Sequence, residues 1–461
     1  MRGGFAAMAA LVALTGCAAP DTPPPQAAAV VAPDAWRGDL AGIAPVDTAW
    51  WRGFGDPVLA RLVEAALANN VDIAIAASRV REARAQEALS RAALLPSLDA
   101  SASGSHSRSV SALGTASESS SAQPIAQAAY EVDLFGRIAD QVSAARSGWL
   151  ASAAARDAAA LSVSAATATG YVSLLGLDAR RAVAEQTVAD RAEALRLARL
   201  RAEAGYTSEL ELRQAEAEYQ ATALILPQVD LAIARQENAL RLLTGDVPGP
   251  VERGGGLAAL RMPALPDEGL PSQILRRRPD IAQAEWTLAA ADSTLAVARK
   301  QYLPTLRLSA SAGAVFNSAL PDTISIWSVG GSILAPLFRG GQLRAGVETA
   351  AARRDQAAFA YRKAALTAFR EVEDALATVA RLGDQRRVLE AQRAAVAQAL
   401  RHATNRYQAG YSGYLEQLDA QRSLLSTQLS LVQLETDQLN ALVALYQVLG
   451  GGWTGPLATN P

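Results

Sequence analysis

The tetrapeptide Ala-Gly-Tyr-Thr at residues 204–207 returns as Ala-Gly-Tyr-Ser at residues 409–412, and this repetition decides the fold. Gly205 and Gly410 lie 205 positions apart, and a leucine follows each tetrapeptide after the same interval. Solenoid and propeller repeats have periods of about 20 to 50 residues, so this much longer period indicates one large module present twice. We therefore expect a pseudo-twofold fold.

Other motifs keep nearly the same spacing. Leu-Pro-Ser-Leu at 95–98 returns as Leu-Pro-Thr-Leu at 303–306, Val-Asp-Ile at 71–73 as Pro-Asp-Ile at 279–281, and Leu-Thr-Gly at 243–245 is echoed by Val-Leu-Gly at 448–450. From these echoes we predict repeat 1 at residues 36–245, a connection at 246–270, repeat 2 at 271–450 and a tail at 451–461.

The middle of each repeat predicts an unusually long helix. From about 137 to 204 and from about 343 to 408 there is no proline, alanine is abundant, and apolar residues recur at helical spacing. At 1.5 Å per residue, a helix of about 68 residues is roughly 100 Å long. Each rod should end at its Gly-Tyr pair, because glycine readily takes the left-handed conformation that closes a helix.

Shorter helices should accompany each rod. One returns from the Gly-Tyr turn, over about 208–243 and 413–449, and another precedes each Leu-Pro motif, over about 57–94 and 271–302. Two short helices stacked end to end match the length of one rod. A soluble antiparallel coiled coil has the same helical pattern, so the helices alone do not decide between these architectures.

The segments after each Leu-Pro motif alternate between polar and apolar residues, which predicts strands with one apolar face. We expect strands within about 97–133 and 305–336, with the second strand of the first pair starting near residue 122. The serine-rich tract at 101–121 would be a strand running into an exposed loop, or else a disordered linker. Four strands cannot close a barrel, whereas several chains that contribute four each could.

The N-terminus has the pattern of a bacterial lipoprotein signal. A positive charge at Arg2 precedes a short apolar stretch, and residues 14–17 read Leu-Thr-Gly-Cys, ending on the only cysteine. We predict a signal peptide at residues 1–16, lipidation of Cys17 and an Ala/Pro-rich tether at 17–35. An ordinary signal peptide with an incidental cysteine is the alternative. Ala18 after the cysteine favours the outer membrane, by resemblance to lipoprotein sorting rules.

Composition excludes several classes of function. The formal net charge is −2, and the 43 basic residues are scattered along the sequence. The sequence therefore shows no cluster of basic residues of the kind that binds nucleic acid. Two histidines, His106 and His402, cannot build a zinc site, and we expect no metal and no cofactor. No nucleophile, histidine and acid are arranged for catalysis, so we do not expect an enzyme. Beyond the signal, no continuous run of 18 apolar residues predicts a transmembrane helix.

Taken together, these motifs resemble the TolC and OprM family of outer-membrane efflux proteins. The residues that carry the resemblance are Trp50-Trp51, Phe54-Gly55-Asp56-Pro57, Leu62-Val63, Asn70 and Asp72, with both Leu-Pro motifs, both Leu-Phe motifs at 134–135 and 337–338, and both Gly-Tyr turns. With its lipoprotein signal, the chain is similar to the NodT lipoprotein branch.

The resemblance implies a mainly α fold with a small membrane β part. It implies a homotrimer with a twelve-stranded barrel in the outer membrane that continues into a twelve-helix periplasmic tunnel. It also implies a periplasmic adaptor (membrane fusion protein) and an inner-membrane pump, usually of the resistance-nodulation-division class. The function it implies is a passive, gated exit duct for drugs, metals or other small molecules. Gly205, Tyr206 and Thr207 of repeat 1 and Gly410, Tyr411 and Ser412 of repeat 2 would face the adaptor.

The family's periplasmic gate lies where the helices converge, and the matching stretch is residues 414–422. Leu415 and Asp419 are four residues apart and share one helix face. Threefold symmetry would place three Asp419 carboxylates, helped by Glu416, around a narrow axis that attracts cations. The alternative is that Asp419 pairs with Arg422, a contact worth about 0.2–0.5 kcal/mol on an exposed helix.

The tip of repeat 1 lacks this acid, because Leu210 and Gln214 occupy the equivalent positions. Ser412 stands where some family members carry a basic residue that locks the closed state. Two other functions remain open: a type I secretion conduit, and a structural or adaptor coiled-coil periplasmic lipoprotein. The latter would need neither paired strands nor a repeat of the whole unit.

Overall fold

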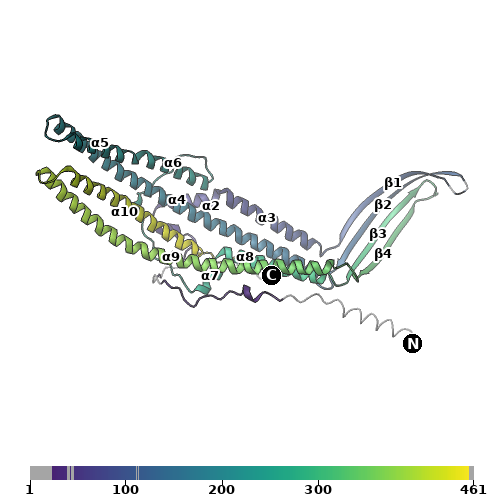
Figure 1. The fold of residues 1–461 in the computed structure, drawn as a ribbon. Coiled ribbons are helices and arrows are strands. Elements are labelled where there is room, and N and C mark those ends of the chain that lie inside the picture. The colour runs from purple at the N-terminus through teal and green to yellow at the C-terminus, as the bar shows by residue number, and fades with distance from the viewer. Residues whose placement is uncertain (1–22, 39–41, 43–45, 111, 113, 456–461) are drawn as a thin grey trace. The chain divides into compact units, whose positions relative to one another are not determined.

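The computed structural model describes residues 23–38, 42, 46–110, 112 and 114–455. Cys17, the predicted signal peptide and the last six residues of the predicted tail lie outside this range. The described helices are α2 (Pro57–Asn69), α3 (Val71–Ala92), α4 (Arg137–Glu203), α5 (Glu209–Ala223), α6 (Ile225–Leu243), α7 (Pro271–Arg277), α8 (Pro279–Lys300), α9 (Gln342–Gln408) and α10 (Tyr414–Val448), with short 3-10 turns η1 (Gln26–Ala28), η2 (Trp50–Phe54) and η3 (Leu257–Ala259). The strands are β1 (Ser97–Val110), β2 (Ala116–Val132), β3 (Thr305–Asn317) and β4 (Ile324–Leu334) (Figure 1).

The chain divides into two compact units. The sheet unit comprises residues 1–29, 78–153 and 283–363 and holds all four strands. The helical unit comprises residues 30–77, 154–282 and 364–461 and holds both Gly-Tyr turns. In each repeat the order of elements is the same: short helices, a strand hairpin, a 67-residue helix and a returning helical segment.

The two predicted rods are confirmed as α4 and α9, each of 67 residues. In chain order, the fourth of the shorter predicted helices is continuous as α10, whereas the other three are interrupted, each for a local reason. Asn70 separates α2 from α3 because its side-chain oxygen accepts from the backbone N–H of Asp72 and Ile73, at 2.9 and 3.3 Å. Pro279 forces Arg278 into an extended conformation and ends α7. Pro227 lacks the N–H that would bond to Ala223, and α5 gives way to α6 at Leu224.

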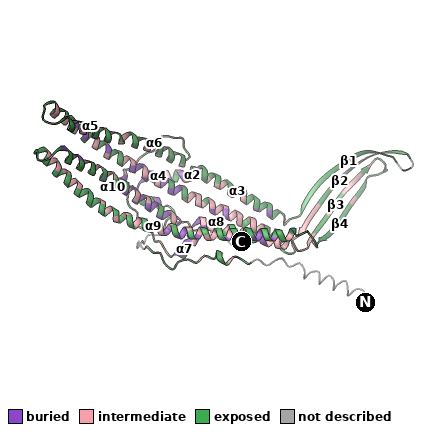
Figure 2. Cartoon of the chain, in the orientation of Figure 1, coloured by how far each residue is buried: buried purple, intermediate pink, exposed green. Residues whose placement is uncertain are grey.

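The sheet unit contains one antiparallel four-stranded sheet in the order β1-β2-β3-β4. Its register places even-numbered residues of β1, β2 and β3 on the same face as odd-numbered residues of β4. That face is apolar: Leu98, Ala100 and Ala102 of β1, Ala126, Ala128 and Tyr130 of β2, Leu306, Leu308 and Phe316 of β3, and Trp327, Val329 and Ile333 of β4. Figure 2 colours β1 as exposed along its whole length, so neither face of this edge strand is covered by the chain itself.

The opposite face of the sheet is lined by serines. Side chains from adjacent strands meet in cross-strand pairs, with Oγ–Oγ distances of 2.9 Å for Ser105–Ser121 and for Ser311–Ser328. The serine hydroxyls bond to one another across the strands, and the backbone groups bond in the antiparallel ladder. The serine-rich tract is therefore strand for most of its length, and the alternative of a disordered linker is wrong. The second strand begins at Ala116, earlier than the predicted start near residue 122.

The helical unit has its core around α4, where Tyr171, Val172, Leu174 and Leu175 are almost completely buried. They pack against η2, α2, α6 and α10, and Trp50 stacks on Tyr446 with ring centroids 5.5 Å apart. Among the described helices, α4 alone holds a stretch long and apolar enough to cross a membrane by length and composition, and half of that stretch is buried inside the structure. A core helix satisfies the same criterion.

Candidate functional site

The two Gly-Tyr turns end α4 and α9 in the same way. In repeat 1, the N–H of Tyr206 donates to the carbonyl of Arg201 at 2.8 Å, and Gly205 N–H donates to Ala202 at 3.0 Å. In repeat 2, Tyr411 donates to Arg406 at 2.8 Å and Gly410 to Tyr407 at 3.1 Å. This is the Schellman cap, and it requires the left-handed glycines found here, with φ of 73° at Gly205 and 77° at Gly410.

Both caps project a tyrosine into solvent. Tyr206 is 86% exposed and Tyr411 is 80% exposed. No heavy atom lies within 4 Å of the position that a Cβ would take at either glycine, so the turns carry no internal packing there. A large aromatic side chain held open on a rigid turn is well suited to contact another protein.

The turns differ in how the next helix begins. Ser208 caps α5 by accepting from the N–H of Glu211 at 3.3 Å, and the Thr207 hydroxyl bonds to the Glu211 carboxylate. In repeat 2, Gly413 precedes α10 without a side-chain cap, and the Ser412 hydroxyl is buried with no hydrogen-bond partner among the residues that the structure describes. The first turn therefore has side-chain hydrogen bonds at the start of its returning helix that the second turn lacks.

Behind the turns, the α4–α5 hairpin packs against the α9–α10 hairpin. Their contact is a small apolar cluster in which Leu195, Ala215, Tyr414 and Leu418 are buried. The Tyr414 ring lies 5.5 Å from that of Tyr407, measured between centroids. Burial raises the pKa of the Tyr414 phenol above its ordinary value.

A buried ionic cluster adjoins this apolar contact, formed by Arg191, Glu218, Gln421 and Arg422. The Glu218 carboxylate lies 3.6 Å from Nη2 of Arg191 on α4 and accepts from Nε of Arg422 on α10 at 2.7 Å. Arg191 also bonds to the Gln421 side chain. The Arg191 and Glu218 side chains are only 5% and 6% exposed, whereas Arg422 is 53% exposed. Burial lowers the pKa of Arg191, and Glu218 is its principal counter-charge.

Comparison with known proteins identifies the chain's relatives. The family model described as outer membrane efflux protein matches residues 62–246 and 270–451. The chain belongs to the outer membrane efflux protein family. It is 36% identical over 432 residues to the solvent efflux pump outer membrane protein SrpC of Pseudomonas putida, which covers 91% of this chain and 90% of SrpC. It is 34% identical over 474 residues to the outer membrane protein OprJ of Pseudomonas aeruginosa, covering 97% of this chain and 96% of OprJ.

The solved structures agree with the family membership. The open state of the MtrE outer membrane channel of Neisseria gonorrhoeae superposes with a TM-score of 0.84 at 30% identity, covering 96% of this chain and all of the MtrE chain. The sheet and the helix tips of this efflux protein thus belong to a channel fold.

The predicted gate residues of this efflux protein lie at the start of α10. Leu415 is more than half exposed, Asp419 is exposed, and neither is part of the apolar cluster behind the turn. The Glu416 carboxylate lies 3.7 Å from the Arg406 guanidinium of α9. Among the described residues, no ion pair joins Asp419 to Arg422, because Arg422 binds Glu218 instead. The alternative of a local Asp419–Arg422 pair is therefore wrong.

Sequence reasoning missed the ionic cluster of the efflux protein. Arg191 lies four residues before the buried Leu195 and so on the same face of α4, where a charge is unusual. That position could have marked Arg191 as buried and paired. Its partners could not have been read from the sequence, because Glu218 and Gln421 lie on other helices.

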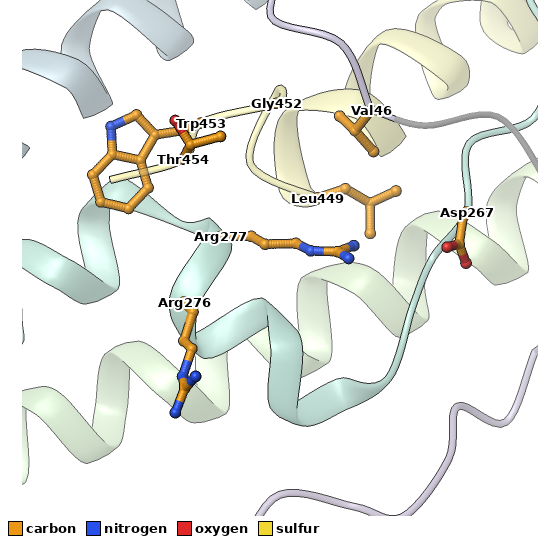
Figure 3. A pocket seen from close by; sticks show the side chains of 8 residues that line it. All are labelled: Val46, Asp267, Arg276, Arg277, Leu449, Gly452, Trp453 and Thr454. Carbon is orange, nitrogen blue, oxygen red and sulfur yellow. The ribbon is translucent and has the colours of Figure 1, made fainter. Parts of the chain in front are cut away.

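A hollow of about 410 Å³ in the helical unit is separate from the tips (Figure 3). Arg276 and Arg277 of α7, Asp267, Leu449 and Trp453 line it. None of the predicted site residues contributes to this hollow. Nor does any group of three or more potential metal ligands occur in the described part of the chain.

Proposed function

We propose that this chain is the outer-membrane lipoprotein channel of a tripartite efflux pump, forming a passive, gated exit duct for small molecules. The observation that carries the proposal is the sheet, which has one apolar face, one serine-lined face and two edges that no other described strand pairs with. In a water-soluble protein such a sheet would leave large apolar side chains uncovered. In a bilayer the same face would contact lipid.

The height of the apolar face fits an outer membrane. On β3 it extends from Leu306 to Phe316, or about 33 Å along a strand that rises about 3.3 Å per residue. With a tilt of about 40°, this becomes a band roughly 25 Å tall, the height typical of outer-membrane barrels. At the far end of β1 the same face turns polar, where His106 pairs with Ser120 and Arg108 lies 3.6 Å from Glu118.

Closure of the barrel requires other copies of the chain. An open sheet edge is not tolerated in lipid, because its backbone N–H and carbonyl groups would have no partner. Pairing β4 of one protomer with β1 of the next satisfies both edges, and three chains give twelve strands. The serine-lined face then becomes the wall of an aqueous duct.

The helix tips carry the residues that we assign to the periplasmic partner and to the gate. We assign Gly205, Tyr206 and Thr207, with Gly410, Tyr411 and Ser412, to docking of a periplasmic adaptor, because both tyrosines are open to solvent. We assign Leu415, Glu416 and Asp419 to the gate on the threefold axis. The adaptor would link the channel to an inner-membrane pump of the resistance-nodulation-division class, and lipid on Cys17 would anchor the complex. The relative SrpC, which is named as a solvent efflux pump outer membrane protein, favours export of small molecules.

Efflux by the reconstituted pump tests the proposal. The gene is expressed with its adaptor and pump in a host that lacks its own channel, and accumulation of a fluorescent substrate is measured. We expect low accumulation with the wild type and high accumulation with Gly205→Pro or Gly410→Pro, because proline cannot take the left-handed cap conformation. Gly383→Ala, in the exposed middle of α9, is the matched control. Normal efflux by both proline variants would refute the assignment of the tips.

A further inference from the structure

The serine-lined face of the sheet carries few charges. Its residues are the odd-numbered ones of β1, β2 and β3 and the even-numbered ones of β4. In these four strands, the ionisable side chains on this face are those of Asp99, Glu131 and Arg307. The remaining residues of the face are serine, glutamine, glycine and other uncharged types, so each charge stands against a neutral background.

Arg307 lies at the end of the sheet where β3 begins and where β2 and β4 end, which we call the base of the sheet. The register places it directly between Glu131 on β2 and Ser332 on β4. Its neighbours on the same face along β3 are Thr305 and Ser309. Within the described sheet, Glu131 is thus the one acid among the side chains that adjoin Arg307 on this face.

Glu131 is already bound to a second arginine. Its Oε1 accepts from Nη2 of Arg137 at 2.6 Å, whereas its Oε2 lies 4.0 Å from Nη2 of Arg307. The side chains of Arg137 and Glu131 are 24% and 22% exposed, whereas that of Arg307 is 67% exposed. One carboxylate therefore faces two guanidinium groups, and the group with the longer contact is the one open to solvent.

The two acids closest in sequence to this cluster have partners of their own. The Asp133 carboxylate accepts from two backbone N–H groups in the first turn of α4, at 2.8 and 3.1 Å. The Asp140 carboxylate lies 2.6 Å from Nζ of Lys300. Because these carboxylates are engaged elsewhere, neither is the counter-charge of Arg307.

Asp99 is too distant to cancel the charge of Arg307. Through Gln127 it aligns with Ser311, which lies four residues from Arg307 along β3. The two positions are therefore about 13 Å apart along the strands and about 10 Å apart across them, or roughly 16 Å in all. This separation exceeds the screening length of about 8 Å at physiological ionic strength. The base of the serine-lined face hence carries an excess of positive charge.

We infer that Arg307 is a specificity-determining residue of the duct, whose positive charge favours the passage of small anions over cations at the base of the serine-lined face. The inference rests on the proposed function, in which this face lines an aqueous duct. Assembly of three chains would place three such charges around the wall at one level, and rings of arginine or lysine favour anions in pores. The site belongs to the sheet unit, whereas the gate proposed at Asp419 belongs to the helical unit.

Ion selectivity in planar bilayers tests the role of Arg307. At an ionic strength of about 10 mM, where a charge acts over about 30 Å, Arg307→Gln should raise the ratio of cation to anion permeability at least twofold. Arg307→Lys keeps the charge and should keep the wild-type ratio. Glu131→Gln removes the opposing charge and should lower the ratio at least twofold.

Arg108→Gln is the matched control. Arg108 also faces a glutamate across two strands, at 3.6 Å from Glu118, but it lies on the opposite face of the sheet. Its loss should leave the ratio of cation to anion permeability unchanged, because this side chain does not face the proposed duct.

Salt separates an electrostatic role of Arg307 from a structural one. At about 1 M the screening length is about 3 Å, so the wild type and Arg307→Gln should have the same permeability ratio. Equal ratios for these two proteins at about 10 mM, or a difference that persists at about 1 M, would overturn the inference. Either result in conducting channels refutes the role of Arg307 alone, whereas a wild type that forms no conducting channel refutes the proposed function as well.

Discussion

Glu218 is the residue on which the polar contact between the two hairpins depends. Its carboxylate is the buried counter-charge of Arg191 and also binds Arg422. Removing one partner of a buried ion pair typically costs about 3–5 kcal/mol, because the remaining charge stays out of water without compensation. The cluster thus couples the position of α10, which carries the proposed gate, to that of α4 and α5.

The first prediction follows from this coupling. Glu218→Ala should loosen the contact between the hairpins and raise the basal conductance of channels in planar bilayers several-fold. The matched control is Glu216→Ala, two residues away, which removes contacts to Arg199 and Arg213 on the exposed surface. Such surface pairs contribute little, so the control should conduct like the wild type. Equal conductance of all three proteins would show that the cluster does not restrain the gate.

Tyr171 gives a second prediction, on stability at alkaline pH. Its hydroxyl donates to Asp56 at 3.1 Å and accepts from the N–H of Gly254 at 2.9 Å. Burial, together with the nearby Asp56 charge, raises the pKa of Tyr171 from 10.0 to about 12. Above pH 10 the unfolded chain loses this proton while the folded chain keeps it. The free energy of unfolding that this proton contributes is therefore fully present below pH 10. It falls by about 1.4 kcal/mol per pH unit as the pH rises toward 12.

Thermal unfolding between pH 9 and pH 12 measures this effect. Tyr171→Phe should be less stable at neutral pH by about 1–3 kcal/mol, because Gly254 N–H loses its partner, but its stability should fall less steeply with pH. Tyr206→Phe, which alters an exposed tyrosine at a tip turn, should keep the wild-type pH dependence. A Tyr171→Phe curve parallel to that of the wild type would contradict the assignment.

At the scale of elements, the strands and long helices followed from local patterns and the breaks did not. The bounds of α4 and α9 lie within one residue of those expected, because the pattern is repeated over 67 residues and ends at glycine. The break at Asn70 depends on one side chain that caps the following helix. The spacing of apolar residues does not reveal such a cap. β2 starts early because serines pair across strands, and such pairing depends on register rather than on hydropathy.

The candidate site was predictable to a similar extent. The exposed turns at Gly205 and Gly410 follow from sequence, since a Schellman cap is a local structure. The Arg191–Glu218–Arg422 cluster is not local, because three helices must pack before the charges meet. The repeat explains the difference: it specifies two similar hairpins, but not the contacts between them.

A third prediction concerns the faces of the sheet. Ser103 pairs with Gln123 on the polar face of β1, and its neighbour Ala102 pairs with Pro124 on the apolar face. In membrane-embedded protein, Ser103→Cys should react with a charged, water-soluble thiol reagent, and Ala102→Cys should react at least tenfold more slowly because lipid covers it. Equal labelling of the two variants would mean that β1 does not separate lipid from an aqueous duct.

At the scale of the whole molecule, one chain leaves its main functional surfaces incomplete. Trp327, Val329 and Ile333 of β4 are more than 70% exposed, and within the described part of the chain the outer edges of β1 and β4 have no partner strand. Assembly around a threefold axis would cover the edges and would bring three copies of each tip together. We therefore expect the properties of the pore to depend on residues that make few contacts within a single chain, such as Asp419 at the proposed gate.

The last prediction concerns charge selectivity at the proposed gate. Asp419 is exposed at the start of α10, on the same helix face as Leu415, and its carboxylate has no ion-pair partner among the described residues. Three such carboxylates around one axis repel one another and attract cations. In planar bilayers, Asp419→Ala should lower the ratio of cation to anion permeability several-fold, because the fixed negative charge is lost. Gln214→Ala, at the equivalent position of repeat 1, removes no charge and should leave the ratio unchanged. If Asp419→Ala keeps the wild-type ratio in channels that still conduct, Asp419 does not line the constriction, and selectivity must arise elsewhere in the duct.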